Sequence, residues 1–569
     1  MAIYLSDEDI INNGIASQTP GPGLIPIALG TGKLDDGWIS SSFERVANKG
    51  AANGYASLDA NSKVIQDPAS LTNIVFCNQY DHPDDAIAAI GSDNKTLLVT
   101  EPEICDTNFT VPSNVTVKFE RGGKWIINDG ITVTIHGQID AGLWQIFQYT
   151  GTGTVKGSAG VTEVYPEWWG AKGDGVADDT TAIQQAINSG VGKSVVFSQT
   201  TYLISDTIHI GQGYGFVDLI GKSMSGVHIT SSNNSKDILQ IHGLWSGYNV
   251  KNLNLSFTSV GTGNGIVFVN NTGYCYGGNF ENMEIAYANK GIYSASGQSF
   301  MNTFTNIIIY HPATGVDLES GTLWKFENCE IDTPSSQGWY LKSIKYSTLV
   351  NCTSVNSTGV IPYYIYTSYG VSLIGCGAEG DVLPNGNGVF TTLGSQVVIN
   401  GWYVGACSAS SGQTGYIVYC DGSGSHTVLT GGYEVGCTNI SQYRIGGSGG
   451  RLVAYENYFG SATPVTSNVI SFGSYKVVTL AANTTTPDVS QGNIFITSAN
   501  TQATTITDLL NPTVGQIVTF IGGSDTNPTT INDGGYFKLS GTMTLGLDDS
   551  ITLLVKAPQY YVELSRSTN

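Results

Sequence analysis

The chain has 569 residues, of which 72 are glycine, 12% are charged and 10% are aromatic. It is longer than one compact domain, and its composition is typical of an all-β or solenoid protein with many tight turns. The formal net charge of −21 disfavours nucleic acid as a partner, because phosphates would be repelled. The nine cysteines have the spacing of neither a disulfide framework nor a zinc site, so we expect reduced thiols, no metal and no cofactor.

Residues 1–75 are expected to form a loop-rich segment, because prolines and glycines at 20–26 interrupt regular structure. The phrases GTGKLDDGWIS (30–40) and NGYASLDANSKVI (53–65) resemble linker repeats near the N-termini of phage tail fibres and tailspikes. That resemblance implies an anchor to a virion; a flexible linker without a partner is the alternative. The sequence indicates neither a signal peptide nor a membrane-inserting stretch.

Residues 76–162 alternate with period two and predict a neck and the first coils of a β-solenoid. The next segment, EVYPEWWGAKGDGVADDTTAIQQAINSG, contains one amphipathic helix, predicted at 179–189. Thr181 and Gln184 have capping-box spacing, and Gly190 ends the helix. Asp174, Asp178 and Asp179 could be catalytic acids, but helix capping and turn formation explain them better.

The phrase WGAKGDGVADDTTAIQQAI resembles the N-terminal signature of the pectate-lyase-like family of phage tailspikes and polysaccharide-degrading enzymes. The resemblance implies an all-β fold, a right-handed parallel β-helix over 163–470 whose open end is capped by this helix.

A repeat supports that fold. The phrases VKNLNLSF, FENMEIAY, FTNIIIYH, FENCEIDT, LVNCTSVN, LIGCGAEG, VINGWYVG and VLTGGYEV recur mostly every 22 to 25 residues, the length of one β-helix coil. Alternation predicts that Cys329 and its counterparts Cys352 and Cys376 point inward. The preceding asparagines mark a bend and form a column at positions 252, 282, 306, 328 and 351.

The outward side chains of the repeat include carboxylates. Asp332, Glu379 and Glu434 fall in one predicted outward column, and Glu330 and Asp381 lie two residues from members of it. Column members two coils apart would be roughly 10 Å apart, and outward neighbours on one strand about 6.7 Å apart. Inverting glycosidases separate their carboxyl groups by about 6.5–9.5 Å. We therefore predict Asp332 and Glu379 as an acid/base pair, with Glu330, Asp381 and Glu434 as alternates.

Aromatic side chains crowd the same coils and could stack on sugar rings, while a lysine could meet an acidic sugar. The predicted substrate-binding residues are Trp324, Trp339, Tyr340, Tyr346, Tyr364, Tyr366 and Lys342. A solvated face without a ligand is the alternative.

Residues 471–569 lose the coil rhythm and alternate like a β-sandwich. The segment resembles C-terminal domains of phage depolymerases, which implies that it trimerises the chain or contacts sugar.

Together these features predict a homotrimeric phage tailspike, assembled in host cytoplasm and acting at the cell surface, that hydrolyses a bacterial capsular or surface polysaccharide. A polysaccharide lyase acting by β-elimination is the first alternative, and a glycan-binding adhesin without catalysis is the second.

Overall fold

The computed structural model describes residues 73–157, 161–215, 217–243, 247–269, 273–295, 299–455, 457–460, 469–472 and 477–569, with the short pairs 16–17 and 25–26. Contacts divide the chain into two units, Met1–Val75 and Phe76–Asn569. Within the first unit, the structure describes the parallel pair β1 (Ala16–Ser17) and β2 (Ile25–Pro26), and residues 73–75, which lead into strand β3 (Ile74–Phe76). The anchor-like phrases at 30–40 and 53–65 lie outside the described residues.

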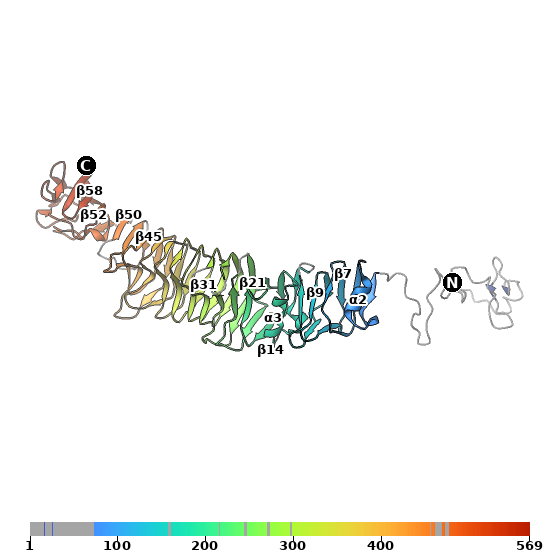
Figure 1. Cartoon of the computed structure of the whole chain (residues 1–569). Helices are drawn as coiled ribbons and strands as arrows, with labels where there is room; N and C mark the ends of the chain where they lie inside the picture. Colours follow the sequence, from blue (N-terminus) through green and yellow to red (C-terminus); the bar gives the residue numbers. More distant parts are fainter. Residues whose placement is uncertain are drawn as a thin grey trace. The chain divides into compact units, whose positions relative to one another are not determined.

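The second unit begins with coils that contribute one strand each to three parallel sheets (Figure 1). Their strands are β3 (Ile74–Phe76), β4 (Lys95–Val99), β5 (Pro102–Cys105), β6 (Phe109–Val111), β7 (Val115–Phe119), β8 (Lys124–Ile127), β9 (Thr132–Ile135), β10 (Gln138–Ala141), β11 (Phe147–Tyr149) and β12 (Thr154–Gly157). The 3-10 turn η4 (Cys77–Gln79) and helix α2 (Pro83–Ile90) contact the first of these coils. Helix α2 was not predicted from the sequence.

The predicted helix is present as α3 (Thr180–Ser189), with Ala182, Ile183, Ala186 and Ile187 buried. Its N-cap residue is Asp179, so the predicted capping box at Thr181 is wrong. Helix α3 contacts β12 before it, η5 (Pro166–Trp169) beside it and β17 (Ile208–Gly211) after it. It therefore has solenoid coils on both sides, whereas the resemblance implied a cap at an open end.

Two large parallel sheets form the main solenoid after α3. The ten-stranded sheet contains β17, β20 (Leu239–His242), β22 (Ile266–Val269), β25 (Lys290–Ser294), β28 (Thr314–Leu318), β32 (Gln337–Lys342), β36 (Ile361–Tyr366), β40 (Gly388–Leu393), β44 (Gly415–Asp421) and β47 (Ile440–Ile445).

The other sheet has 26 strands and bends around the solenoid. It contains β13 (Glu163–Val164), β14 (Asp174–Asp178), β15 (Ser194–Phe197), β16 (Thr201–Ile204), β18 (Asp218–Gly221), β19 (His228–Ser231), β21 (Tyr248–Phe257), β23 (Cys275–Tyr276), β24 (Gly278–Ala286), β26 (Ser299–Phe300), β27 (Thr303–Tyr310), β29 (Gly321–Thr322), β30 (Lys325–Glu327), β31 (Glu330–Asp332), β33 (Ile344–Lys345), β34 (Thr348–Val350), β35 (Thr353–Val355), β37 (Tyr369–Ile374), β38 (Gly377–Glu379), β41 (Gln396–Asn400), β42 (Tyr403–Gly405), β45 (His426–Thr430), β46 (Tyr433–Val435), β48 (Arg451–Tyr455), β49 (Tyr458–Phe459) and β50 (Val469–Phe472). Strands β39 (Val382–Leu383) and β43 (Ser408–Ala409) form a separate two-stranded parallel sheet.

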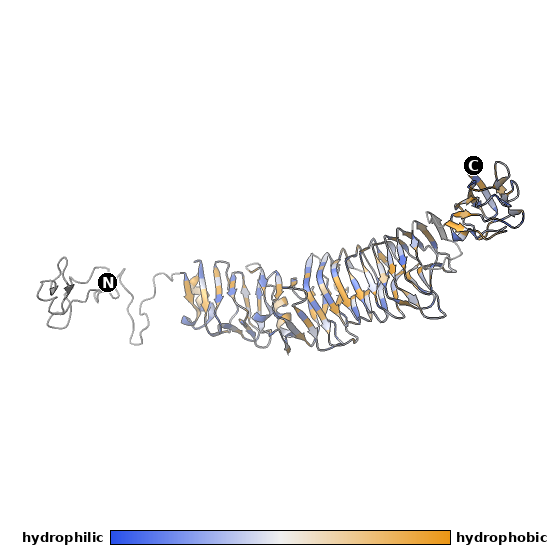
Figure 2. Cartoon of the chain, turned by 180° about the vertical axis from the view of Figure 1, so that it is seen from behind, coloured by the Kyte–Doolittle hydropathy of each residue, from blue (hydrophilic) through white to orange (hydrophobic). Residues whose placement is uncertain are grey.

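Hydrophobic and hydrophilic residues alternate along the solenoid strands, as Figure 2 shows, because successive side chains point to opposite faces of a strand. Cys329, Cys352 and Cys376 are buried, which confirms their predicted inward orientation. The parallel β-helix predicted from the coil period is likewise confirmed.

The bend within the 26-stranded sheet depends on left-handed backbone conformations. Asn252, Asn282, Asn306, Asn328 and Asn351 have φ between 50° and 57°. Asparagine tolerates this region better than most residues, and here its carboxamides also pair from coil to coil. Each Nδ2 donates to the Oδ1 of the asparagine before it, over 3.0–3.3 Å. The predicted asparagine column is therefore a hydrogen-bonded ladder.

Residues 477–569 form a six-stranded and a three-stranded sheet. The first contains β51 (Val477–Thr479), β52 (Ile494–Ile496), β54 (Ile517–Ile521), β58 (Ser550–Ala557), β59 (Tyr560–Ser567) and β56 (Phe537–Lys538); the second contains β53 (Thr504–Ile506), β55 (Thr529–Ile531) and β57 (Met543–Leu545). The 3-10 turn η6 (Val489–Gln491) lies between β51 and β52. Side chains from both sheets, including Phe495, Phe520 and Ile531, share one hydrophobic core. In the part of the chain that the structure describes, no helix is long and apolar enough to cross a membrane.

Candidate functional site

Three of the five predicted carboxylates lie on one outer face of the solenoid. Strand register pairs Asp332 with Val355 and Val355 with Glu379, so the two acids share one outward column with a single coil between them. At 4.8 Å per strand, their backbones are about 9.6 Å apart. Glu330 is the next outward residue of the Asp332 strand. We call the outer surface of β31, β35 and β38 the carboxylate face.

Neighbouring donors orient the acids of the carboxylate face. Asp332 Oδ1 accepts hydrogen bonds from the Thr333 hydroxyl at 2.8 Å and from Asn356 Nδ2 at 3.3 Å. Glu330 Oε2 accepts a 3.5 Å hydrogen bond from the Thr353 hydroxyl. Glu379 is exposed to solvent. Asp332 therefore has one occupied oxygen, and Glu379 is accessible from outside.

Tyr310 belongs to the same surface, because it pairs in register with Asp332. Burial raises the pKa of the Tyr310 phenol, and the charges of Glu284, Glu330 and Asp332 raise it further. The phenol therefore stays protonated and can donate a hydrogen bond at neutral pH. Sequence reasoning missed this tyrosine, although it stood in the aligned outward column.

Glu434 does not belong to this face, because its side chain is fully buried. Register pairs Glu434 with Val404, and Val404 with Ala378, all of which point inward. The predicted outward position is wrong because the alignment of this part of the repeat is shifted by one residue. Gly401 and Gly431 have the left-handed backbone of the ladder asparagines, so they lie at the bend itself, whereas the alignment placed them one residue after the bend. A shift of one residue moves a side chain to the opposite face of a strand.

Asp381 is also fully buried, so its predicted place beside Glu379 on the surface is wrong. Gly380 has a φ of 71°, and this bend interrupts the alternation between the two acids. Asp381 Oδ1 accepts hydrogen bonds from the backbone N–H of Ser357, at 2.8 Å, and from its hydroxyl. Oδ2 is buried without a hydrogen-bond partner in the described part of the chain. Burial raises the pKa of Asp381 to about 6, and the charge of Asp332 contributes.

The predicted substrate-binding aromatics are not gathered at the carboxylates. Trp324 and Trp339 are core residues with 1% and 0% exposure, so a role in stacking on a surface glycan is wrong for both. Tyr346 is exposed at a left-handed bend next to β33. The remaining members lie on strands β32 and β36 of the ten-stranded sheet: Tyr340, Tyr364, Tyr366 and Lys342.

These residues of the ten-stranded sheet form a separate surface. Tyr340 and Tyr364 stack with ring centroids 5.5 Å apart. Lys342 Nζ lies 3.5 Å from Glu319. Their strands and those of the carboxylates belong to different sheets, so the two sets point out of different sides of the solenoid.

A groove of about 480 Å³ adjoins the carboxylate face along the asparagine ladder. It is lined by Met224, Ile308 and four ladder asparagines, at 252, 282, 306 and 328. Ile308 pairs in register with Glu284 on one side and Glu330 on the other. Carboxamides that can bind hydroxyl groups therefore border the acids directly.

A second aromatic feature escaped sequence reasoning. Tyr403, Tyr433 and Tyr458 are 42%, 45% and 56% exposed and stack with centroids 6.4 and 4.8 Å apart. Register places Tyr403 in the column of Glu330, after Thr353 and Gly377. The alignment error of one residue at Gly401 concealed this tyrosine ladder.

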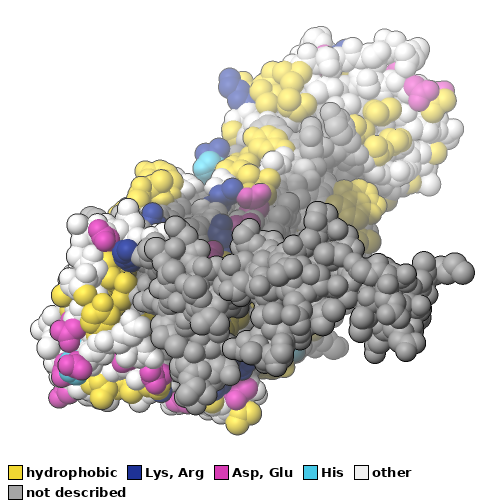
Figure 3. All heavy atoms as spheres, turned by 90° about the vertical axis from the view of Figure 1, so that its right-hand side faces the viewer, with side chains coloured by type: hydrophobic (Ala, Val, Ile, Leu, Met, Phe, Trp, Pro, Cys, Tyr) yellow, Lys and Arg dark blue, Asp and Glu magenta, His cyan; other side chains and the backbone are white. Residues whose placement is uncertain are grey.

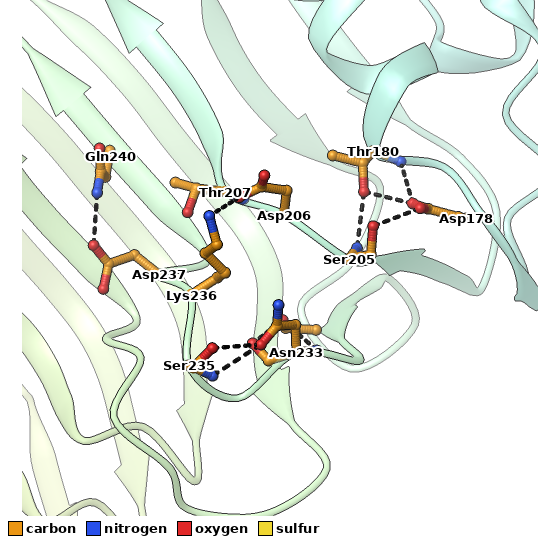
Figure 4. Close-up of polar contacts among 11 residues, drawn as sticks. Asp178, Thr180, Ser205, Asp206, Thr207, Asn233, Ser235, Lys236, Asp237 and Gln240 are labelled. Carbon is orange, nitrogen blue, oxygen red and sulfur yellow. Dashed lines mark hydrogen bonds and ion pairs between the residues drawn. The ribbon is translucent and has the colours of Figure 1, made fainter.

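The acidic residues near α3 hold turns, as expected. Asp178 Oδ1 accepts a 3.0 Å hydrogen bond from the backbone N–H of Thr180, and Asp178 Oδ2 accepts one of 2.6 Å from the Ser205 hydroxyl (Figure 4). Asp179 accepts the N–H groups of Lys172 and Gly173. Each carboxylate is thus engaged by the local backbone.

No group of three or more histidine, cysteine, aspartate and glutamate side chains could hold a metal ion among the described residues. On the face shown in Figure 3, acidic side chains lie dispersed among uncharged and apolar ones.

Residues 168–359 match the sequence model of a family described as rhamnogalacturonase A/epimerase, pectate lyase-like. The matched segment runs from η5 through α3 to the turn after β35. It is a pectate-lyase-like β-helix, and the resemblance predicted from the WGAKGDG signature is confirmed. A search of curated proteins found no match to the chain.

Several solved structures are similar to parts of the chain. The A-module of mannuronan C-5 epimerase AlgE6 from Azotobacter vinelandii is 17% identical, with 54% of this chain and 99% of that chain covered and a TM-score of 0.40. The tailspike of Acinetobacter phage vb_AbaP_AS12 is 12% identical, with 72% and 82% covered and a TM-score of 0.43. The enzymatically active domain of tailspike protein 2 of bacteriophage CBA120 is 14% identical, with 55% and 51% covered and a TM-score of 0.43.

Proposed function

We propose that the chain is a phage tailspike that binds a bacterial capsular or surface polysaccharide and cuts it by endo-glycosidic hydrolysis. The observation that carries the proposal is the placement of Glu330, Asp332 and Glu379 on one outward face, beside a groove floored by asparagine carboxamides. The phrases at 30–40 and 53–65 support attachment to a virion through residues 1–75.

Asp332 and Glu379 are the proposed acid/base pair. Asp332 Oδ1 accepts two hydrogen bonds, which orient the group and leave Oδ2 to take a proton from water. Glu379 donates a proton to the departing glycosidic oxygen as the bond to the anomeric carbon breaks. The oxygen of that water forms the new bond to the anomeric carbon from the face opposite Glu379, and a backbone separation of about 9.6 Å leaves room for the water between Asp332 and the sugar.

Elimination is less well supported, because it needs a base beside a uronate and a cation to neutralise the carboxylate. Tyr310 pairs in register with Asp332, and burial and the acidic neighbours raise the pKa of its phenol, which makes it a poor base. Lys251 and Lys325, on the strands that precede the asparagine bend, are each paired with a glutamate at 2.8 Å. The surroundings of the groove thus favour hydrolysis over β-elimination.

The test measures new reducing ends from a panel of purified bacterial capsular polysaccharides. Asp332→Asn and Glu379→Gln should each lower the rate on the susceptible polysaccharide by about a thousandfold, the scale of a lost general acid or base. Glu284→Gln, which changes a carboxylate on β24 of the same sheet, two coils before Glu330, is the matched control and should retain the rate within about threefold.

Wild-type rates in both acid variants would refute the site. Products that absorb ultraviolet light as unsaturated uronides would show a lyase instead. Binding to a polysaccharide without release of any ends would show an adhesin.

A further inference from the structure

The groove of about 480 Å³ along the asparagine ladder combines amide groups with apolar side chains. Four ladder carboxamides line it together with Met224 and Ile308. Asn306, in the middle of the ladder, donates one N–H to Asn282 and accepts one from Asn328. A carboxamide has two N–H donors and two acceptor lone pairs. The exposed carboxamide of Asn306 therefore keeps one N–H and one lone pair for a ligand.

Ile308 gives this groove an apolar surface beside a carboxylate. It is half-buried on strand β27, two residues after Asn306. Register pairs it with Glu330 on the next coil, about 4.8 Å away at the backbone. Glu330 Oε2 accepts a 3.5 Å hydrogen bond from the Thr353 hydroxyl, and no described residue donates to Oε1. A ligand group on Ile308 therefore meets an amide donor, an apolar side chain and a carboxylate acceptor.

Charge disfavours an acidic ligand group at this position. Glu330 forms no ion pair in the part of the chain that the structure describes, and Lys251 and Lys325 are each held by another glutamate at 2.8 Å. A uronate or phosphate group beside Ile308 would be repelled, whereas an uncharged N–H donor would be attracted. The group that fits has a carbonyl oxygen, an N–H and a methyl group, and no negative charge. An acetamido group meets each of these requirements.

We infer that the groove binds the acetamido group of an uncharged N-acetylated sugar. The carbonyl oxygen of that group accepts the second N–H of Asn306, its N–H donates to Glu330 Oε1, and its methyl group packs on Ile308. An O-acetyl ester has the same carbonyl and methyl groups but no N–H, so it satisfies only part of the site. The inference rests on the proposed function for a polysaccharide as the ligand, and it adds the class of sugar that the groove selects.

The experiment uses full-length protein carrying Glu379→Gln, so that bound polysaccharide is not cut. Affinity electrophoresis in gels containing capsular polysaccharides from the same panel gives dissociation constants, and we expect binding to uncharged N-acetylated members. A bound polysaccharide is then N-deacetylated and re-acylated with either acetyl or formyl groups. The formyl amide keeps the carbonyl and the N–H but lacks the methyl group, so it should bind about fivefold more weakly than the re-acetylated form.

A second variant locates the methyl contact. Adding Ile308→Thr should weaken binding of the acetyl form about fivefold and binding of the formyl form less than twofold, because both changes remove the same contact. Ile374→Thr is the matched control. Ile374 is another isoleucine of the solenoid surface, 42% exposed and outside the lining of the groove, so its replacement should leave both affinities unchanged.

Equal affinities for the acetyl and formyl forms would overturn the inference. So would an Ile308→Thr protein that unfolds at the temperature of its parent and either binds the acetyl form unchanged or weakens both forms equally. Mild alkali, which removes only O-acetyl esters, should leave binding intact; loss of binding at that step would assign the groove to an ester and overturn the amide. Binding only to uronate-containing polysaccharides, or to none, overturns the inference as well.

The same measurements separate this inference from the proposed hydrolysis. Ile308-dependent binding of an N-acetylated polysaccharide by a wild-type protein that releases no reducing ends would support the groove and refute only the hydrolysis. Release of reducing ends from a polysaccharide without N-acetyl groups would overturn the groove and leave the hydrolysis standing.

Discussion

At the residue scale, Asp381 is a buried acid whose surroundings raise its pKa. Its carboxyl group is enclosed in the solenoid wall and receives both donors from Ser357, while Oδ2 remains unpartnered among the described residues. Because burial raises its pKa to about 6, the folded chain binds more protons than the unfolded chain between pH 4 and 6. The preferential protonation of Asp381 in the folded chain therefore stabilises the fold at low pH, and this stabilisation is lost as the pH rises through 6.

Asp381→Asn should accordingly stabilise the protein at pH 7.5 by about 2 kcal/mol in free energy of unfolding, because it removes a buried charge. The gain should shrink toward zero at pH 4.5. Denaturant unfolding at both pH values measures the difference between variant and parent. Asp129 is the control of opposite sign: donors from Thr152 lower its pKa, so its Asn variant should lose stability at pH 7.5. A gain by Asp381→Asn that is equal at both pH values would contradict the argument.

At the scale of elements, the asparagine ladder joins the coils at the bend of the sheet. Asn306 donates to Asn282 at 3.0 Å and accepts from Asn328 at 3.3 Å, with a φ of 56°. Two effects therefore stabilise this position, the side-chain hydrogen bonds and tolerance of the left-handed backbone. Equivalent coils further along replace the asparagine by Gly375 and Gly401, which retain only the second effect.

Two substitutions separate the effects. Asn306→Ala should lower the free energy of unfolding by about 3 kcal/mol, because it loses two hydrogen bonds and strains the backbone. Asn306→Gly should cost about 1 kcal/mol less, because glycine adopts the positive φ freely. Denaturant titrations of the two variants and the parent provide the comparison. Equal costs would mean that the backbone conformation contributes nothing.

The same bend determines how far sequence reasoning could go. Period and alternation predicted the coils, the inward cysteines and the outward Asp332 and Glu379 correctly, because the bend residues of their phrases, Asn328, Asn351 and Gly375, each stand directly before a cysteine and align with one another. In the last two phrases no cysteine follows the bend, the bend residues Gly401 and Gly431 were aligned one position too late, and Glu434 was assigned to the wrong face. The same slip concealed Tyr403.

Which aromatic residues are buried and which are exposed could not be predicted from the sequence for a different reason. The sequence shows that aromatic residues are frequent between 324 and 366, but these include core residues such as Trp339 and surface residues of the other sheet such as Tyr364. Only the order of strands around each coil separates them.

At the scale of the whole molecule, the homotrimer predicted from the sequence requires an interface. The outer face of the six-stranded sheet provides an apolar one: Ile517 is 46% exposed and pairs in register with Leu554, which pairs with Val562. Neighbouring strand β52 adds the half-buried Ile494 and Ile496. Contiguous apolar side chains on a sheet face are typical of surfaces that associate.

Ile517→Glu should therefore shift the full-length protein from trimer to monomer, because a charge buried in an apolar interface costs several kcal/mol per chain. Sedimentation velocity measures the change. Leu547→Glu is the matched control, since Leu547 is 51% exposed on a loop outside that sheet and should leave the trimer intact. Polysaccharide binding by the monomer would then show whether one chain is sufficient for binding. If binding is lost together with the trimer, the complete glycan site lies between chains. If the affinity is unchanged, the site lies on the carboxylate face of a single chain. A protein that remains trimeric with Ile517→Glu would exclude this sheet as the interface.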